Sequence, residues 1–164
     1  EDILAYAESR GEPPFIVILD GVEDPHNLGA VIRVAECAGV HGIVIPKHRA
    51  ASVNDTVIKV SSGAAEHMRV ARVTNINDTI AFLQERGVWV FAADMDGDDL
   101  YSANLTGAVA FVVGGEGKGV SRLTRERCDG VLAIPMFGKV NSLNASVAAG
   151  IVVYEKVRRD RVGK

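Results

Sequence analysis

Short apolar runs alternate along the chain with stretches whose apolar residues recur every three or four positions. The first pattern predicts buried strands, and the second predicts helices with one apolar face. Gly39 is expected to end the first such helix. The predicted strands are 15–19, 42–45, 68–73, 88–93, 108–113 and 131–134, and the predicted helices are 28–38, 77–86, 121–128 and 145–159.

This alternation predicts an α/β fold, a mostly parallel sheet with helices on both faces. The continuously apolar run 108–113 is typical of a strand at the centre of such a sheet. Ligands of parallel sheets bind at the carboxyl ends of the strands. Polar turns follow three of the predicted strands, and they carry Asn27, Glu116 and Asn144. We therefore expect these three turns to share one site.

The segment 134–148 says most about the chemistry of that site. An apolar strand runs into a Pro-Gly turn, and a polar loop then brings Ser142, Asn144 and Ser146 to the start of the last helix. A loop of this kind exposes backbone N–H and C=O groups beside short side chains. It suits a small polar cofactor better than a phosphate or a metal ion.

The length of 164 residues and the 48% hydrophobic content indicate one globular domain. Residues 1–14 are polar and end in two prolines, so we interpret them as a linker or the tail of an N-terminal domain, with residues 15–164 as the folded domain. The chain begins at Glu1, which is typical of a fragment. No apolar run is long enough to span a membrane, and two distant cysteines, Cys37 and Cys128, are typical of a reduced, cytoplasmic protein.

The net charge of −3, taken alone, argues against a nucleic-acid partner. Charges more than about 8 Å apart are screened at physiological salt, however, so local clusters matter more than the total. Solvated helix faces remain an equally good interpretation of the basic residues at the C-terminal end. The basic clusters are Arg122, Arg125 and Arg127; Lys47, His48 and Arg49; and Lys156, Arg158, Arg159, Arg161 and Lys164.

The glycine-rich stretch 114–119 does not match a nucleotide-binding loop. In the dinucleotide fingerprint a third glycine would stand at Val120 or Arg122, and in the phosphate-binding loop Ser or Thr would stand at Gly119. Glu116 would also repel a phosphate, although it would tolerate a ligand with positive charge. A nucleotide-dependent oxidoreductase is therefore excluded, and a merely flexible turn stays open.

No metal site is predicted either. The four histidines lack ligand spacing with one another or with the cysteines. The acidic segment 94–99 resembles a calcium loop, but Leu105 stands where the loop requires glutamate. We interpret this segment as a solvated acidic turn.

Three motifs, each following a predicted strand, resemble the SpoU family of RNA ribose 2′-O-methyltransferases in the SPOUT superfamily. The likeness covers nearly the whole chain, about 15–159. Further matches around 24–30, 63–66 and 123–126 are most similar to the RlmB-like branch, which methylates a guanosine ribose in 23S ribosomal RNA. The three motifs are Asn27-x-Gly29-x-x-x-Arg33, Gly114-Gly115-Glu116-Gly117, and Ile134-Pro135-Met136-x-Gly138 continuing to Ser142-Leu143-Asn144-x-Ser146.

The resemblance implies more than the pattern of residues does. It implies a C-terminal deep trefoil knot, S-adenosylmethionine as cofactor with no metal, a homodimer through the knot and the last helix, and an RNA substrate. In the last helix, Val147, Ile151 and Tyr154 would form the dimer seam. The implied catalytic residues are Arg33, Asn27, Glu116 and Asn144, and the implied cofactor-binding residues are Gly114, Gly115, Ile134, Met136, Gly138, Ser142, Leu143 and Asn144.

Arg33 is the catalytic arginine that the resemblance implies. Arginine stays protonated at a pKa above about 12, so we interpret Arg33 as a fork for phosphate or ribose oxygens rather than as a base. Asn27 and Glu116 would orient Arg33 or the ribose. Two structural roles stay open: Glu116 could fix its own loop, and Asn144 could cap the last helix.

Two other functions stay open. The substrate could be transfer RNA, because its ribose methyltransferases share the three motifs. The chain could also be an RNA-binding module without activity, although the intact Asn27, Arg33, Glu116 and Asn144 argue against this.

Overall fold

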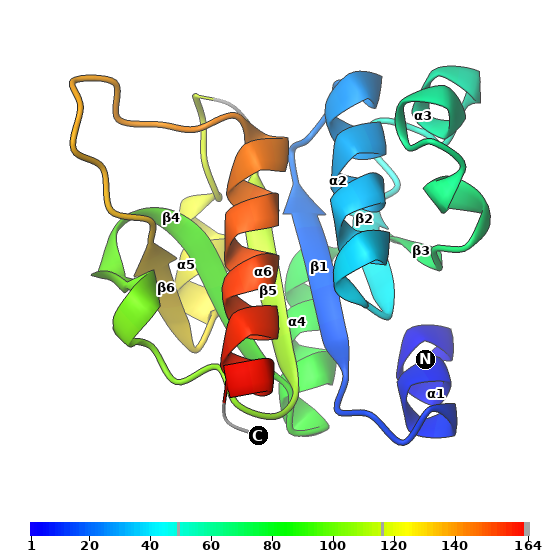
Figure 1. The fold of residues 1–164 in the computed structure, drawn as a ribbon, viewed down its shortest axis with the longest axis horizontal. Helices are drawn as coiled ribbons and strands as arrows, with labels where there is room; N and C mark the ends of the chain where they lie inside the picture. Colours follow the sequence, from blue (N-terminus) through cyan, green and yellow to red (C-terminus); the bar gives the residue numbers. More distant parts are fainter. Residues whose placement is uncertain (49, 116, 163–164) are drawn as a thin grey trace.

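The computed structural model describes residues 1–48, 50–115 and 117–162, and a six-stranded sheet forms its centre (Figure 1). Neighbouring strands all run parallel, in the spatial order β3-β2-β1-β5-β4-β6. The predicted α/β class and parallel sheet are confirmed. The strands are β1 (Phe15–Asp20), β2 (Gly42–Pro46), β3 (Val70–Val73), β4 (Trp89–Asp99), β5 (Val109–Gly114) and β6 (Gly130–Ala133).

Helices cover both faces of the sheet, as predicted (Figure 1). Alternate strand residues point to opposite faces, so Val17 belongs to the core under α2 and α6, and Ile16 to the core under α4. The helices are α1 (Asp2–Ser9), α2 (Pro25–Ala38), α3 (Asp55–Val60), α4 (Ile76–Glu85), α5 (Arg122–Arg127) and α6 (Ala145–Val162), with the 3-10 turns η1 (Ala64–Glu66) and η2 (Leu100–Ser102).

The boundaries of α2 follow from its terminal residues. The Asp24 carboxylate accepts a hydrogen bond from the His26 N–H at 2.8 Å, and Pro25 needs no partner at the first helical position. Gly39 adopts the left-handed conformation, φ 84°, and ends the helix as predicted.

Residues 1–14 include a helix, whereas a polar linker was expected there. Ile3 and Ala7 lie one helical turn apart and are both buried against the domain. On the same helix, the Tyr6 ring lies 3.5 Å under the Arg69 guanidinium. Two apolar residues were too few to give a clear helical period, so the sequence did not indicate α1.

The acidic segment 94–99, expected as a solvated turn, is instead the second half of β4. After a register shift it pairs with the edge strand, with Asp98 opposite Leu132. The Asp94 carboxylate accepts the Val120 N–H at 3.1 Å, so it fixes the loop after β5. Pairing of β4 with β5 ends at Ala93, so the acidic half of β4 pairs with β6 alone and has one open side, with which acidic residues are compatible.

Smaller differences concern short elements. α3, η1 and η2 were not predicted, β3 begins at Val70 rather than at residue 68, and α6 continues to Val162. The predicted helix 121–128 is shorter: Ser121 precedes α5, and its hydroxyl donates to the Thr124 hydroxyl at 2.8 Å instead of capping a backbone N–H.

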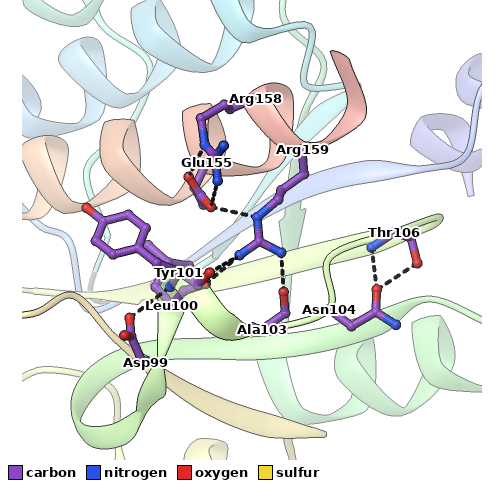
Figure 2. Close-up of polar contacts among 9 residues, drawn as sticks. All are labelled: Asp99, Leu100, Tyr101, Ala103, Asn104, Thr106, Glu155, Arg158 and Arg159. Carbon is purple, nitrogen blue, oxygen red and sulfur yellow. Dashed lines mark hydrogen bonds and ion pairs between the residues drawn. The ribbon is translucent and has the colours of Figure 1, made fainter. Parts of the chain in front are cut away.

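Arg159 joins α6 to the connection between β4 and β5 (Figure 2). Its guanidinium donates to the backbone carbonyls of Leu100, Tyr101 and Ala103, and to the Glu155 carboxylate at 2.7 Å. The Glu155 side chain is only 5% exposed. Hydrogen bonds from Arg158 and Arg159 hold the pKa of Glu155 below its ordinary value, against the opposing effect of burial.

Within residues 1–48, 50–115 and 117–162, no helix combines the length and the apolar character that crossing a membrane requires.

Candidate functional site

The loops after β1 and β5 lie in direct contact, because the two strands are neighbours and pair up to Asp20 and Gly114. Beyond the strands, the Gly115 N–H donates to the Asp20 carbonyl at 3.1 Å. The Asp20 carboxylate in turn accepts the Ser121 N–H at 2.9 Å. Two of the three predicted turns therefore meet at the carboxyl end of the sheet.

Close backbone approach explains the glycines at 114 and 115. A Cβ on Gly114 would lie 2.1 Å from the Gly119 carbonyl carbon, and a Cβ on Gly115 would lie 2.4 Å from the Gly21 carbonyl oxygen. A side chain at Gly115 would push the loops after β1 and β5 apart, and one at Gly114 would push the end of the glycine-rich loop away from β5. The glycine-rich stretch is therefore a packed structure rather than a merely flexible turn.

The third turn crosses the sheet to join the first. β6 lies at the edge of the sheet, but the chain that follows it returns to α6, which packs beside α2 (Figure 1). Asn144 ends this loop, and its Nδ2 donates to Asn27 Oδ1 at 3.0 Å. Two predicted catalytic residues, 117 positions apart in the chain, are thus brought into contact.

Asn144 also caps the last helix. Its Oδ1 accepts the N–H groups of Ser146 and Val147, at 2.9 and 3.3 Å. Both roles considered for Asn144 are therefore compatible, because its amide nitrogen faces Asn27 while its oxygen holds the start of α6.

The loop between β6 and Asn144 is rich in unpaired polar backbone. Within the described part of the chain, residues 135–143 form no hydrogen bond. Met136 and Ser142 are exposed, Gly138 faces open space, and Leu143 is half-buried. This stretch can therefore offer backbone donors and acceptors to a polar ligand, as the sequence indicated.

The predicted cofactor residues have different surroundings. Ile134 packs against the apolar core, so its side chain is structural and its backbone starts the loop. Gly114 and Gly115 are fixed by the contacts given above, whereas residues 135–143 are held only at their ends. Glu116, predicted as catalytic, lies outside the described residues.

Arg33 is the fourth residue predicted as catalytic. It is exposed on α2, and among the described residues it has no hydrogen bond or ion pair, so Asn27 pairs with Asn144 rather than with Arg33. Arg33 lines a cavity of about 250 Å³ between α2 and the segment 61–67. The sequence did not indicate this cavity, because the helix that positions it was not predicted.

A second cavity, of about 630 Å³, lies beside the edge of the sheet and includes none of the predicted site residues. Trp89, Asp98 and Asn104 are among its lining residues. The Asp129 carboxylate, also in its wall, accepts the Val90 N–H at 2.8 Å and so holds the start of β4.

Sequence reasoning missed two carboxylates that hold the loops, Asp20 and Asp94. Each accepts a backbone N–H from the residues that follow the glycine-rich stretch. The available signal was the position of both at the carboxyl end of an apolar run. The described residues include no group of three or more His, Cys, Asp or Glu side chains able to hold a metal ion.

Comparison with known proteins gives a consistent result. Residues 14–154 match the model of the SpoU rRNA Methylase family. The 23S rRNA (guanosine-2'-O-)-methyltransferase RlmB of Neisseria meningitidis is 50% identical, over 100% of this chain and 64% of that protein. The SpoU methyltransferase AviRb from Streptomyces viridochromogenes, crystallised in complex with the cofactor AdoMet, is 31% identical with a TM-score of 0.85, over 93% of this chain and 60% of the other.

A tRNA modifying enzyme has the same fold. The A. aeolicus TrmH/SpoU enzyme is 29% identical with a TM-score of 0.83, over 93% of this chain and 78% of the other. The chain spans less than two thirds of the length of the Neisseria relative. Motifs, sheet order and family match agree, and the chain belongs to the SpoU rRNA methylase family.

Proposed function

We propose that this domain transfers a methyl group from S-adenosylmethionine to a ribose 2′-OH in RNA, at a guanosine of 23S ribosomal RNA. The observation that carries the proposal is the loop 135–143, whose backbone groups have no described partner, anchored to α2 by the Asn144–Asn27 hydrogen bond. The family match and the names of the relatives support the reaction and the substrate.

The chain's own residues fit such a cofactor. An adenine edge and ribose hydroxyls need several donors and acceptors at fixed positions, and the backbone of Gly114, Gly115, Ile134, Met136, Gly138, Ser142 and Leu143 can supply them. When bound, the cofactor supplies a methyl group on a positively charged sulfur. The thioether that leaves is neutral, so neither an acid nor a metal ion is needed to stabilise it.

In this proposal the protein contributes mainly alignment. Good alignment of two reactants contributes about 7–11 kcal/mol to lowering a barrier. General acid–base catalysis raises the rate by about 10²–10⁴-fold, which corresponds to a smaller lowering of the barrier. Loops fixed by the half-buried carboxylates of Asp20 and Asp94 and by close glycine contacts are suited to alignment.

Arg33 is proposed to hold the phosphate or ribose oxygens of the RNA. Its planar guanidinium presents five donors and remains charged, so it lowers the pKa of a nearby 2′-OH, and the hydroxyl proton passes to water as the oxygen takes the methyl group. The absence of any described partner for Arg33 leaves those donors available to the substrate. Glu116 and the Asn27–Asn144 pair complete the proposed catalytic set.

The test compares methyl transfer with cofactor binding. Arg33→Ala in the protein at its full natural length should abolish transfer of labelled methyl groups to ribosomal RNA, while calorimetric titration of S-adenosylmethionine stays nearly unchanged. Arg86→Ala, on the opposite face of the sheet, is the control and should retain both. Loss of cofactor binding in Arg33→Ala would contradict the assigned role.

Transfer RNA is the second candidate substrate, because the A. aeolicus neighbour is named a tRNA modifying enzyme. Parallel assays with ribosomal and transfer RNA distinguish the two. The 50% identity to a 23S rRNA methyltransferase favours ribosomal RNA.

Two further features belong to this proposal, a knot and a homodimer. We infer that the chain after β6 is threaded as a trefoil knot; its return from the sheet edge to α6 supports this. The protein would form a homodimer through that region and the α6 face containing Val147, Ile151 and Tyr154. Val147 and Tyr154 are 50% and 44% exposed, and Ile151 is half-buried against the core. A monomer in sedimentation at micromolar concentration would contradict the dimer.

Domain organisation is proposed in the same way. Residues 15–164 would form the catalytic domain, and residues 1–14 would connect it to an N-terminal RNA-binding domain. Limited proteolysis of the protein at its full natural length should cleave before α1, whose Ile3 and Ala7 are buried against the domain, and release a folded domain that includes this helix.

A further inference from the structure

The cavity beside Arg33 has a mixed polar lining. Arg33 and Glu36 come from α2, and Ser62, Glu66 and His67 come from the segment across the cavity. Its volume of about 250 Å³ is slightly below the 300–1,000 Å³ typical of sites for drug-sized ligands. It therefore suits one small planar group rather than a whole cofactor.

The far wall of this cavity is firmly built. A Cβ on Gly29 would lie 2.8 Å from Val60 Cβ, so α3 packs directly against the α2 backbone and places the following segment near Arg33. Ser61 is 1% exposed, and its hydroxyl donates to the Ile58 carbonyl at 2.9 Å and accepts the Ala65 N–H at 3.2 Å. This wall can hold side chains in a defined position.

The side chains that face the cavity are free to bind. Among the described residues, Arg33, Glu36, Glu66 and His67 have neither a side-chain hydrogen bond nor an ion pair. The cavity thus presents a cation on one wall and a carboxylate on the opposite wall.

We propose that this cavity receives the guanine base of the target nucleotide and that Glu66 selects guanine. The inference rests on the proposed function and adds to it the residue that reads the base. The Glu66 carboxylate would accept hydrogen bonds from guanine N1–H and the 2-amino group, while Arg33 holds the attached ribose or its phosphate.

Base chemistry supports the choice of guanine. A carboxylate accepts but does not donate, and it has two oxygens side by side. Guanine has two adjacent donors on its Watson–Crick edge, whereas adenine, cytosine and uracil each place an acceptor beside their donor there. Glu66 is chosen over Glu36 because Glu36 lies on the same helix as Arg33, one turn away, whereas Glu66 lies across the cavity.

The experiment measures base preference rather than activity alone. The methylated guanosine is first mapped, and RNA fragments are then made with guanosine, inosine or adenosine at that position. Inosine lacks the 2-amino group and so removes one of the two proposed hydrogen bonds. The wild type should show a kcat/KM for guanosine about 10-fold above that for inosine and about 100-fold above that for adenosine.

In Glu66→Gln the ratio of guanosine to inosine should fall close to one, since an amide cannot accept both hydrogen bonds. Glu36→Gln removes a carboxylate from the same cavity and should keep the wild-type ratio. Glu66→Asp, which retains the carboxylate, should keep a preference for guanosine at a reduced rate. Thermal unfolding of each variant shows that the fold is intact.

Three outcomes would overturn the inference: an unchanged ratio in Glu66→Gln, a change confined to Glu36→Gln, or a mapped nucleotide that is not guanosine. Failure of the proposed function is a separate result, because the wild-type protein would then transfer no methyl group to any RNA.

Discussion

Replacing Arg159 with alanine should destabilise the domain more than any change to a neighbouring surface arginine. The side chain is 24% exposed, and it binds three backbone carbonyls and the Glu155 carboxylate (Figure 2). A hydrogen bond to a charged group contributes about 1.5–3 kcal/mol, and bonds from one side chain are not additive. Breaking a buried ion pair completely costs about 3–5 kcal/mol. Because Arg158 still neutralises the Glu155 charge in this variant, we expect the free energy of unfolding to fall by somewhat less, about 2–4 kcal/mol.

The assay is equilibrium unfolding in urea, with thermal melting as a second measurement. At about 2–4 °C per kcal/mol for a chain of this size, the melting temperature of Arg159→Ala should fall by about 4–16 °C. Arg158→Ala is the matched control: Arg158 binds the same carboxylate, but its side chain is 56% exposed, so its loss should lower the free energy of unfolding clearly less than the loss of Arg159. Equal losses in the two variants would refute the assignment of the stabilisation to the backbone carbonyls.

Other predictions concern packing, thiol reactivity and pH. Gly29→Ala should lower the free energy of unfolding by about 1–3 kcal/mol, because its Cβ would overpack against α3. The Cβ of Gly150→Ala would lie 3.4 Å from its nearest neighbour, so this variant should be neutral or stabilising in urea unfolding. The reverse order would refute the packing argument. Burial and nearby carboxylates raise the pKa of Cys128 to about 12. Iodoacetamide at neutral pH should therefore modify the exposed Cys37 and should reach Cys128 only after unfolding. Peptide mass spectrometry measures the modification at each cysteine. Folding lowers the pKa of Glu155, so its contribution to stability is present above its ordinary pKa and is lost as the pH falls through the folded value. The difference in unfolding free energy between wild type and Glu155→Gln should therefore shrink in acid. A difference that does not depend on pH would contradict this.

The sequence was sufficient for the elements with strong periodicity. Apolar runs located all six strands, and Gly39 marked the end of α2. Short elements lacked such a signal: α3 has six residues, and α1 buries only Ile3 and Ala7 as its apolar contacts. The acidic end of β4 was misinterpreted because pairing at a sheet edge does not require an apolar sequence.

The candidate site was predictable only in part. Parallel strands necessarily place their carboxyl ends together, so the shared location of the polar turns followed from the pattern. The contact between Asn27 and Asn144 did not, because it depends on the loop after β6 returning across the sheet. Likewise, the position of Arg33 beside Glu66 depends on the packing of α3 against Gly29, a contact that no spacing in the sequence encodes.

A crystal structure of the protein with S-adenosylmethionine tests the central claim most directly. The account predicts the cofactor between the Gly114–Gly115 backbone and the loop 135–143, with new hydrogen bonds to backbone groups that have no described partner. Cofactor bound instead in the cavity beside Trp89 and Asn104, or no binding at saturating concentration, would contradict it.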